Sequence, residues 1–322
     1  MKKFFLMFTM FLFVAATANA AIVLDYADNQ SEEYPTIAAA QKFAQLVKAK
    51  TNGRVTVNVQ PGAKLANEEI VLKQLEFGTI DMSRISIPYY ANSFDEFKVL
   101  QMPYIFDSAA HMHKVLDGAI GDGFLKLTEK ENVIALCWFD AGARNFYTTN
   151  KPIKTLEDFK LLKLRVQPSE VSVAMANALG ATPVPLAYGE VYGALISGEI
   201  DGAENNFSSY ISVRHNDAAK YLTLTEHMRQ PELVVISKSA LKELTPADQK
   251  AVREAAKEAA KYEREIWTAY EADAKKEAVR KGTKIITLAP AERAKIKAAM
   301  QKLEASYSKE YKAIIDKIRN AK

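Results

Sequence analysis

Apolar residues along this chain follow two spacings, one with a period of two residues and one with the wider period of amphipathic helices. Alternation occurs at 22–27 and 55–60, and short, mainly apolar segments that also indicate strands lie at 80–86, 133–139, 144–149, 164–166, from 200 onward, at 233–237 and at 283–288. Helical spacing occupies 34–50, 67–77, stretches beginning near 108 and 169, 245–282 and the C-terminal region from 290. Because strands and helices alternate, we predict an α/β fold with parallel strands.

A short sequence pattern occurs twice. Leu75–Asp81 and Leu195–Asp201 share the form Leu-x-x-Gly-x-Ile-Asp, and each copy follows a predicted strand and helix. Gly78 and Gly198 stand where the helix ends, a position that favours a left-handed backbone. This repeat, in a chain long enough for two hydrophobic cores, predicts two lobes built in a similar way.

The helix that Thr245 and Pro246 begin has no breaker before Gly282, which makes it about 50 Å long. That length exceeds one domain of this size, so we predict that the helix spans both lobes. Gly142 marks a first crossing between lobes, and the strand 233–237 returns to the first. We assign residues 21–141 and 231–270 to the first lobe, and 142–230 and 271–322 to the second.

The first twenty residues have the features of a signal peptide. Lys2 and Lys3 precede the apolar stretch 4–16, and Ala18-Asn19-Ala20 forms a cleavage site, so we expect cleavage after Ala20. The single cysteine excludes an intrachain disulfide, which suits the bacterial periplasm. Acidic and basic residues are interleaved at a formal net charge of +4, which does not resemble a nucleic-acid-binding surface.

The sequence contains no recognisable catalytic motif. The four histidines lack metal-site spacing, no serine lies in a Gly-x-Ser-x-Gly turn, and no glycine-rich phosphate loop is present. We therefore expect neither catalysis, nor a metal, nor a cofactor.

Two arginines on predicted strands are the strongest candidates for a site. Arg165 lies between Leu164 and Val166, and Arg144 begins the preceding strand. A guanidinium in such a position needs an anionic partner, either an internal carboxylate or a ligand. Two guanidiniums in one cleft would repel each other unless an anion bridged them, so we expect both to await a ligand carboxylate. Glu204-Asn205-Asn206 follows the strand from Ile200 and is either a turn or part of the same site.

The chain resembles the periplasmic solute-binding subunits of TRAP transporters, the DctP family. The likeness covers almost the whole mature chain and rests on the order of several segments: 52–54, 75–81, 142–149, 151–158, 164–167, 180–188, 202–206 and the long helix. It implies a two-lobed periplasmic binding protein fold with a cleft between the lobes, and delivery of the ligand to membrane permease subunits. It also implies that Arg165 forms a two-pronged salt bridge to a ligand carboxylate, that Arg144 assists, and that Asn205 donates a hydrogen bond.

Segments 82–86, 142–147 and 225–227, the last followed by Pro231-Glu232, are most similar to those of uronate-binding members, which implies a hexuronate such as glucuronate or galacturonate. Ser86 stands where sialic-acid binders carry an acid. The further candidate ligand-binding residues are Arg84, Glu68, Tyr188, Asn206 and His227, with Phe207 as a possible cleft wall. Arg84 either faces the cleft or pairs with acids on the solvent side, and Glu68 either accepts sugar hydroxyls or stabilises a helix N-terminus. A C4-dicarboxylate or aldarate binder is the alternative within the family. Outside it, the alternatives are a periplasmic lyase or hydrolase acting on sugar acids and a sensory subunit that presents a ligand. We expect a monomer.

Overall fold

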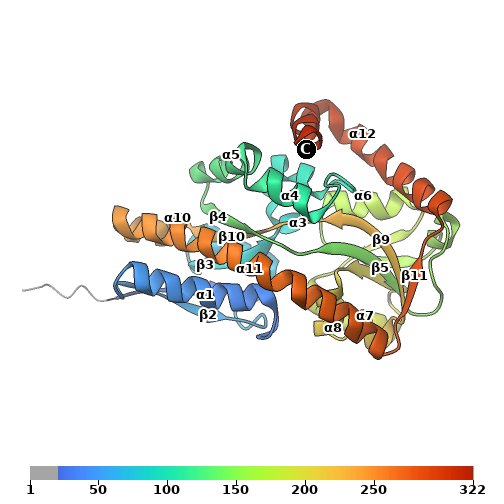
Figure 1. Cartoon of the computed structure of the whole chain (residues 1–322), viewed down its shortest axis with the longest axis horizontal. Helices are drawn as coiled ribbons and strands as arrows, with labels where there is room; N and C mark the ends of the chain where they lie inside the picture. The colour runs from blue at the N-terminus through green and yellow to red at the C-terminus, as the bar shows by residue number, and fades with distance from the viewer. Residues whose placement is uncertain (1–20, 322) are drawn as a thin grey trace, which may run out of the picture.

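The computed structural model describes residues 21–321, apart from the side chains of 308–310, so the expected signal peptide and its cleavage site lie outside the described residues. Two sheets form the centres of two lobes (Figure 1). The first has the order β2 (Val55–Gln60), β1 (Ile22–Ala27), β3 (Met82–Ser86), β10 (Glu232–Ser237), β4 (Val133–Phe139). The second has the order β11 (Lys284–Thr287), β9 (Tyr221–Arg229), β5 (Ala143–Thr148), β8 (Gly202–Asn205), β6 (Lys163–Val166), β7 (Thr182–Pro185).

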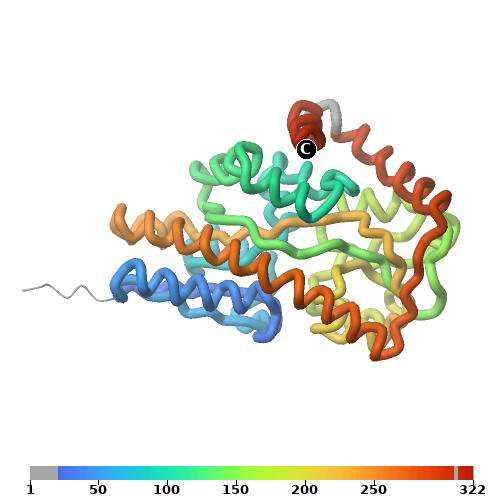
Figure 2. The backbone as a smooth tube through the Cα atoms, in the orientation of Figure 1, coloured from blue at the N-terminus to red at the C-terminus, as the bar shows by residue number. Residues whose placement is uncertain are grey.

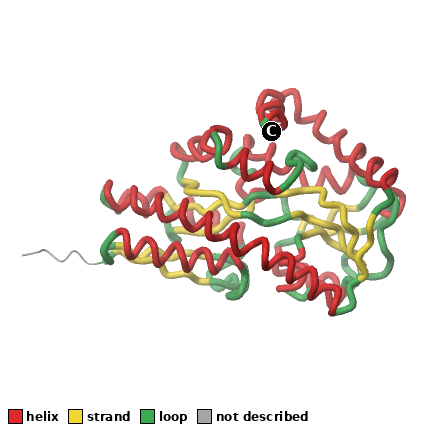
Figure 3. The backbone as a smooth tube through the Cα atoms, in the orientation of Figure 1, coloured by secondary structure: helices red, strands yellow, loops and turns green. Residues whose placement is uncertain are grey.

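Helices cover both sheets, as the red and yellow segments of Figure 3 show. In the first lobe they are α1 (Pro35–Lys50), α2 (Glu68–Phe77), α3 (Ile87–Tyr90), α4 (Ala109–Leu116), α5 (Ala119–Leu127) and α10 (Lys238–Glu243), with 3₁₀ segments at Asp95–Gln101 and Thr128–Lys130. The second lobe has α6 (Glu170–Ala178), α7 (Val191–Ser197), α8 (Phe207–Ser212) and α9 (His215–Ala218), with 3₁₀ segments at Leu156–Phe159 and Tyr188–Glu190. The two longest helices, α11 (Pro246–Arg280) and α12 (Pro290–Asn320), contact elements of both lobes.

Strands that lie between two layers of helices bury apolar side chains on both faces of the sheet. In β10, Leu233 and Val235 join the core shared with α2 and α5, whereas Val234 and Ile236 join the core beneath α1 and α11. The continuous apolar run at 233–236 is therefore explained by burial on both faces.

The repeated pattern has the same structural role in both lobes. Gly78 and Gly198 have left-handed φ angles of 73° and 75° at the ends of α2 and α7. One carboxylate oxygen of Asp81 accepts the backbone N–H of Asp25 on the neighbouring parallel strand, at 2.8 Å. Asp201 accepts the backbone N–H of Lys163 at the same distance. The prediction of left-handed glycines at these positions is confirmed.

The chain passes between the lobes at two adjacent strand connections. Residues 140–142 join β4 to β5, and residues 230–231 join β9 to β10, as the green and gold segments of Figure 2 show. Helix α11, which is 35 residues long, crosses as well and packs against α1 in the first lobe and α8 in the second. The carboxylate of Glu263, in the middle of α11, accepts the backbone N–H of Asp140 at 3.0 Å. The predicted long helix across both lobes is therefore present.

None of the helices between residues 21 and 321 combines the length and the apolar composition that a bilayer span requires.

Candidate ligand-binding site

A pocket lies between the two lobes, at the carboxyl ends of parallel strands from both sheets. Asn29, Ser86, Gln167 and Asn205 are at or just beyond the ends of β1, β3, β6 and β8. About 360 Å³ of space there is free of protein atoms, part of it open to solvent. The complete lining is Asn29, Gln30, Glu68, Ser86, Tyr89, Ala141, Arg144, Arg165, Gln167, Tyr188, Asn205, Asn206, Ser209 and Glu232. This is the position at which open α/β sheets bind ligands.

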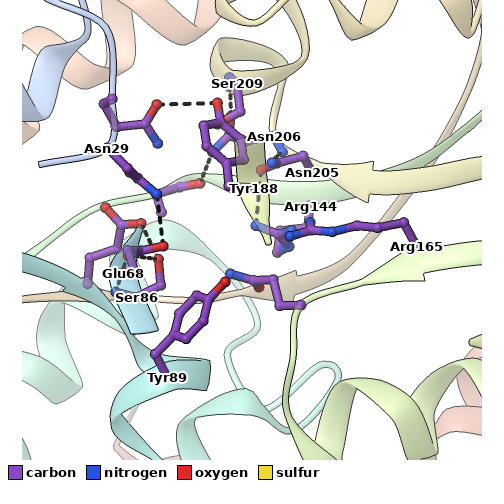
Figure 4. Close-up of a pocket in the computed structure, with 14 residues that line it drawn as sticks. Asn29, Glu68, Ser86, Tyr89, Arg144, Arg165, Tyr188, Asn205, Asn206 and Ser209 are labelled. Atoms are coloured by element: carbon purple, nitrogen blue, oxygen red, sulfur yellow. Dashed lines mark hydrogen bonds between the residues drawn. The ribbon is translucent and has the colours of Figure 1, made fainter. Parts of the chain in front are cut away.

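The two walls of the pocket differ in chemistry (Figure 4). Asn29, Glu68 and Ser86 of the first lobe lie on one side, and Arg144, Arg165 and Asn205 of the second lobe lie on the other. One wall therefore presents carboxylate and hydroxyl oxygens, and the other presents guanidinium groups.

Arg165 is a buried cation without a carboxylate partner among the described residues. Its side chain is 1% exposed, and its Nε and Nη2 atoms donate to the backbone carbonyl of Leu186 at 2.9 and 2.7 Å. Burial lowers the pKa of Arg165, and the nearby guanidinium of Arg144 lowers it further, against the opposing effect of Glu204. An anion in the pocket would relieve this uncompensated charge.

Arg144, in contrast, is already neutralised inside the protein. Its Nη2 atom donates to Glu204 at 2.8 Å, its Nε atom also contacts that carboxylate, and its Nη1 atom donates to Asn205 at 3.0 Å. Burial alone would raise the pKa of Glu204, but Arg144 and His227 lower it to about 2. The expectation that both guanidiniums await a ligand is wrong for Arg144, because the acid it needs is 60 positions away in the sequence but on the adjacent strand of the sheet.

Asn205 and Asn206 line the pocket in different ways. The side-chain oxygen of Asn205 accepts from Arg144 and from the backbone N–H of Asn206, while its amide nitrogen makes no hydrogen bond to any described residue. Asn206 is the N-cap of α8: its oxygen accepts from Ser209 at 2.6 Å and its amide nitrogen donates to Ala141 at 2.7 Å. The side chain of Asn205 thus retains a donor for a ligand, whereas the polar atoms of the Asn206 side chain are used in hydrogen bonds within the protein.

Arg84 lies behind the pocket rather than in it. Its side chain is 0% exposed and forms ion pairs with Asp28 at 2.8 Å, Glu68 at 3.1 Å and Glu232 at 2.9 Å. Burial alone would lower the pKa of Arg84, but these three carboxylates raise it well above its usual value. The interpretation of Arg84 as a donor facing the cleft is wrong, and so is the alternative of pairing with solvent-side acids, because its three carboxylate partners are buried.

Two of the three carboxylates around Arg84, those of Glu68 and Glu232, line the pocket. Glu68, which follows the N-cap Asn67, accepts from the backbone N–H and the hydroxyl of Ser86 at 2.9 and 2.8 Å, and its other oxygen accepts from Asn29 at 3.0 Å. Glu232, the first residue of β10, accepts from Arg84 through one oxygen. Burial raises the pKa of Glu232 to about 7, with Glu68 and Asp28 adding to the effect.

The remaining expected site residues fall into two groups. Tyr188 lines the pocket, and its hydroxyl donates to Gln30 of the first lobe at 3.3 Å. His227 is 0% exposed, stacks on Phe146 at 4.3 Å between ring centroids, and lies 3.5 Å from Glu204, so it stands behind the pocket wall. Phe207 belongs to the core of the second lobe.

Sequence reasoning did not identify several lining residues, among them Asn29, Gln30, Tyr89, Gln167, Ser209 and Glu232. Glu232 was detectable by the argument that identified Arg165, because it is a charged residue at the end of an apolar strand run. Gln167 stands two positions after Arg165, and its buried side-chain oxygen has no partner among residues 21–321.

Comparison with known proteins decides the family. The model for bacterial extracellular solute-binding proteins of family 7, the DctP family, matches residues 26–310. The chain belongs to this family. A solute-binding protein of Chromohalobacter salexigens is 39% identical over 234 residues, covering 73% of this chain and 70% of that protein.

Two solved structures of TRAP periplasmic solute-binding proteins are similar throughout. One, from Xanthobacter autotrophicus with bound β-D-galacturonate, has a TM-score of 0.89 and 37% identity, covering 93% of this chain and all of that one. The other, from Chromohalobacter salexigens with bound D-glucuronate, has a TM-score of 0.89 and 33% identity, with the same coverage. The expected two-lobed fold is confirmed. DctP-family proteins are periplasmic, bind small organic acids and work with a TRAP permease, and they are solute-binding proteins rather than enzymes, which sets aside the lyase or hydrolase alternative.

Proposed function

We propose that this DctP-family protein captures a hexuronate, of the D-glucuronate or D-galacturonate type, and delivers it to its TRAP permease. The observation that carries the proposal is Arg165, a buried guanidinium that faces a pocket and lacks a carboxylate partner among the described residues. A ligand carboxylate supplies the missing negative charge, and hydrogen bonds between charged groups contribute about 1.5–3 kcal/mol each.

The neighbouring donors fit the same group. The amide nitrogen of Asn205 has no hydrogen-bond partner in the part of the chain that the structure describes. The Arg144 guanidinium lies beside it and is already balanced by Glu204. Arg144 therefore contributes hydrogen-bond donors and position, while Arg165 contributes the net charge. The opposite wall, with Glu68, Ser86 and Glu232, supplies acceptors for the hydroxyl groups of a sugar.

The ligand would also hold the lobes together, because its two ends meet residues of different lobes. Direct contacts already join the lobes beside the pocket, where Tyr34 and Ser209 share a hydrogen bond of 2.9 Å and Tyr188 donates to Gln30. A ligand that binds both walls favours the closed arrangement by the difference in its affinity for the closed and open states. The uronates in the two solved relatives support this class of ligand.

The test is a calorimetric titration of the mature protein with D-glucuronate, D-galacturonate, succinate, sialic acid and neutral D-glucose. We expect stoichiometric binding of at least one uronate and no binding of glucose. A protein that binds none of the uronates would overturn the proposal.

The proposal includes two further features of the mature protein, cleavage after Ala20 and a monomeric state. N-terminal sequencing of the periplasmic product and its mass by light scattering test both. A start other than Ala21, or a dimer mass, would contradict them.

A further inference from the structure

The wall opposite Arg165 carries more negative than positive charge. Asp28, Glu68 and Glu232 surround the single guanidinium of Arg84, and all four side chains are buried. One cation cannot balance three carboxylates, so this wall repels an anion that approaches it, whereas the Arg165 wall attracts one.

We propose that this acidic cluster makes the site selective for acids with a single carboxylate, and that Glu232 is the specificity-determining residue that rejects aldarates and other dicarboxylates. The inference rests on the proposed function, because it assumes that the ligand carboxylate is held at Arg165. Arg84 is the positioning residue that holds the three carboxylates in place.

Glu232 is the member of the cluster with an unused oxygen. Its Oε1 atom accepts from Arg84 at 2.9 Å and from the Ser86 hydroxyl at 3.3 Å, and its Oε2 atom has no hydrogen bond to any part of the chain that the structure describes. Both oxygens of Glu68 are engaged by Ser86, Arg84 and Asn29. Of the two acids that line the pocket, Glu232 is thus the one free to meet the distal end of a ligand.

The Oε2 atom of Glu232 distinguishes ligands by the chemical group at the end that lies away from Arg165. A hydroxyl group donates a hydrogen bond to a carboxylate, but a second carboxylate on the ligand has no proton to donate and repels it. Because the pocket lies between the lobes and is only partly open to solvent, solvent screens this repulsion less than it would at the protein surface. A sugar acid therefore binds in a single orientation, with its carboxylate at Arg165 and its hydroxyl groups at Glu232.

The strength of this rejection depends on pH. Burial and the adjacent Glu68 and Asp28 raise the pKa of Glu232 to about 7, so near neutral pH part of the population is protonated. The charged and titratable groups that influence Glu232, or that Glu232 influences, are Arg84, Glu68, Asp28, Tyr26, Tyr34, Arg144 and Glu263. A dicarboxylate is thus rejected more strongly at pH 8 than at pH 6.

The test compares D-gluconate with D-glucarate, two open-chain acids that differ only in the oxidation of one terminal carbon. Calorimetric titrations at pH 6 and pH 8 use the full mature protein, the Glu232→Gln variant and, as a control, Glu243→Gln, which removes an exposed carboxylate on α10. Thermal unfolding verifies that each protein is folded, and uronate binding is verified in the unsubstituted protein and in the Glu243→Gln control. Glutamine keeps the oxygen that accepts from Arg84, so the cluster retains its geometry.

We expect Glu232→Gln to improve glucarate binding relative to gluconate by at least tenfold at pH 8, and the control to change nothing. In the unsubstituted protein, the preference for gluconate should be larger at pH 8 than at pH 6, which tests the inference even if the variant does not fold. An unchanged preference in Glu232→Gln, or one independent of pH in the unsubstituted protein, would overturn it. If the unsubstituted protein binds neither D-glucuronate nor D-galacturonate, that result refutes the proposed function instead.

Discussion

Arg144 and Arg165 line the same pocket, but of these two arginines only Arg144 forms an ion pair with a carboxylate of the described residues. The two arginines should therefore respond differently to substitution. Replacing Arg165 removes a buried charge that forms no ion pair with any described residue, whereas replacing Arg144 leaves the buried carboxylate of Glu204 without its partner.

Arg165→Met should abolish the increase in melting temperature that D-glucuronate produces, without lowering the stability of the unliganded protein. Methionine fills much of the same volume and carries no charge to desolvate. Thermal unfolding with and without 1,000-fold excess uronate measures both effects, and Arg280→Met on the exposed end of α11 serves as the control. A ligand-dependent shift that persists in Arg165→Met would remove Arg165 from the site.

Arg144→Met should destabilise the unliganded protein by about 3–5 kcal/mol, because it leaves Glu204 buried without its partner. Urea unfolding gives this value. The double variant Arg144→Met, Glu204→Gln should recover a large part of the loss, since the buried charge is then gone as well. If the double variant is no more stable than the single one, Arg144 does not act through Glu204.

Glu232 gives a dependence of stability on pH whose sign can be worked out. Its folded-state pKa of about 7 lies above the unfolded value of about 4.3, so the folded state binds more protons between these two pH values. Its contribution to stability therefore falls by at most about 3–4 kcal/mol as the pH rises from about 4.3 to 7, and it stays constant at higher pH. The free energy of unfolding of Glu232→Gln minus that of the unsubstituted protein should rise over this range. Parallel pH profiles for the two proteins would contradict the raised pKa.

Gly142, in the connection between lobes, has a left-handed φ of 62°, and an added Cβ would lie 3.1 Å from the indole nitrogen of Trp267 on α11. Gly198 has a similar φ of 75°, but a Cβ added there would meet no atom within 4 Å. Alanine at either position incurs a backbone cost of about 1 kcal/mol, and Gly142→Ala should lose about 1–3 kcal/mol more through the contact with Trp267. Chemical unfolding of both variants measures the difference. Equal losses would show that Trp267 moves aside without cost.

Much of the fold was predictable because local patterns specify it. The strands at 22–27, 55–60 and 133–139 have the predicted limits, since turn residues flank these apolar segments. The position of the site followed from parallel strands, whose carboxyl ends meet at one edge of each sheet.

The charge pairing within the site was not predictable. Arg84 binds acids that are 16, 56 and 148 positions away in the sequence, and Arg144 binds one 60 positions away. The periodicity of apolar residues identifies a strand and the residues at its end, but it does not identify which strand lies beside it in the sheet. For that reason Arg84 and Arg165 look alike in sequence, although Arg84 is surrounded by carboxylates and Arg165 is paired with none between residues 21 and 321.

Helix α11 is anchored in both lobes and continues without interruption over 35 residues. Such a helix keeps its two ends at a nearly constant separation of about 50 Å while the lobes move around it. Spin labels or fluorophores attached near Lys250 and Lys276 would therefore serve as an internal ruler. A second pair, on α1 and α7 across the cleft, would report opening and closing against that fixed reference.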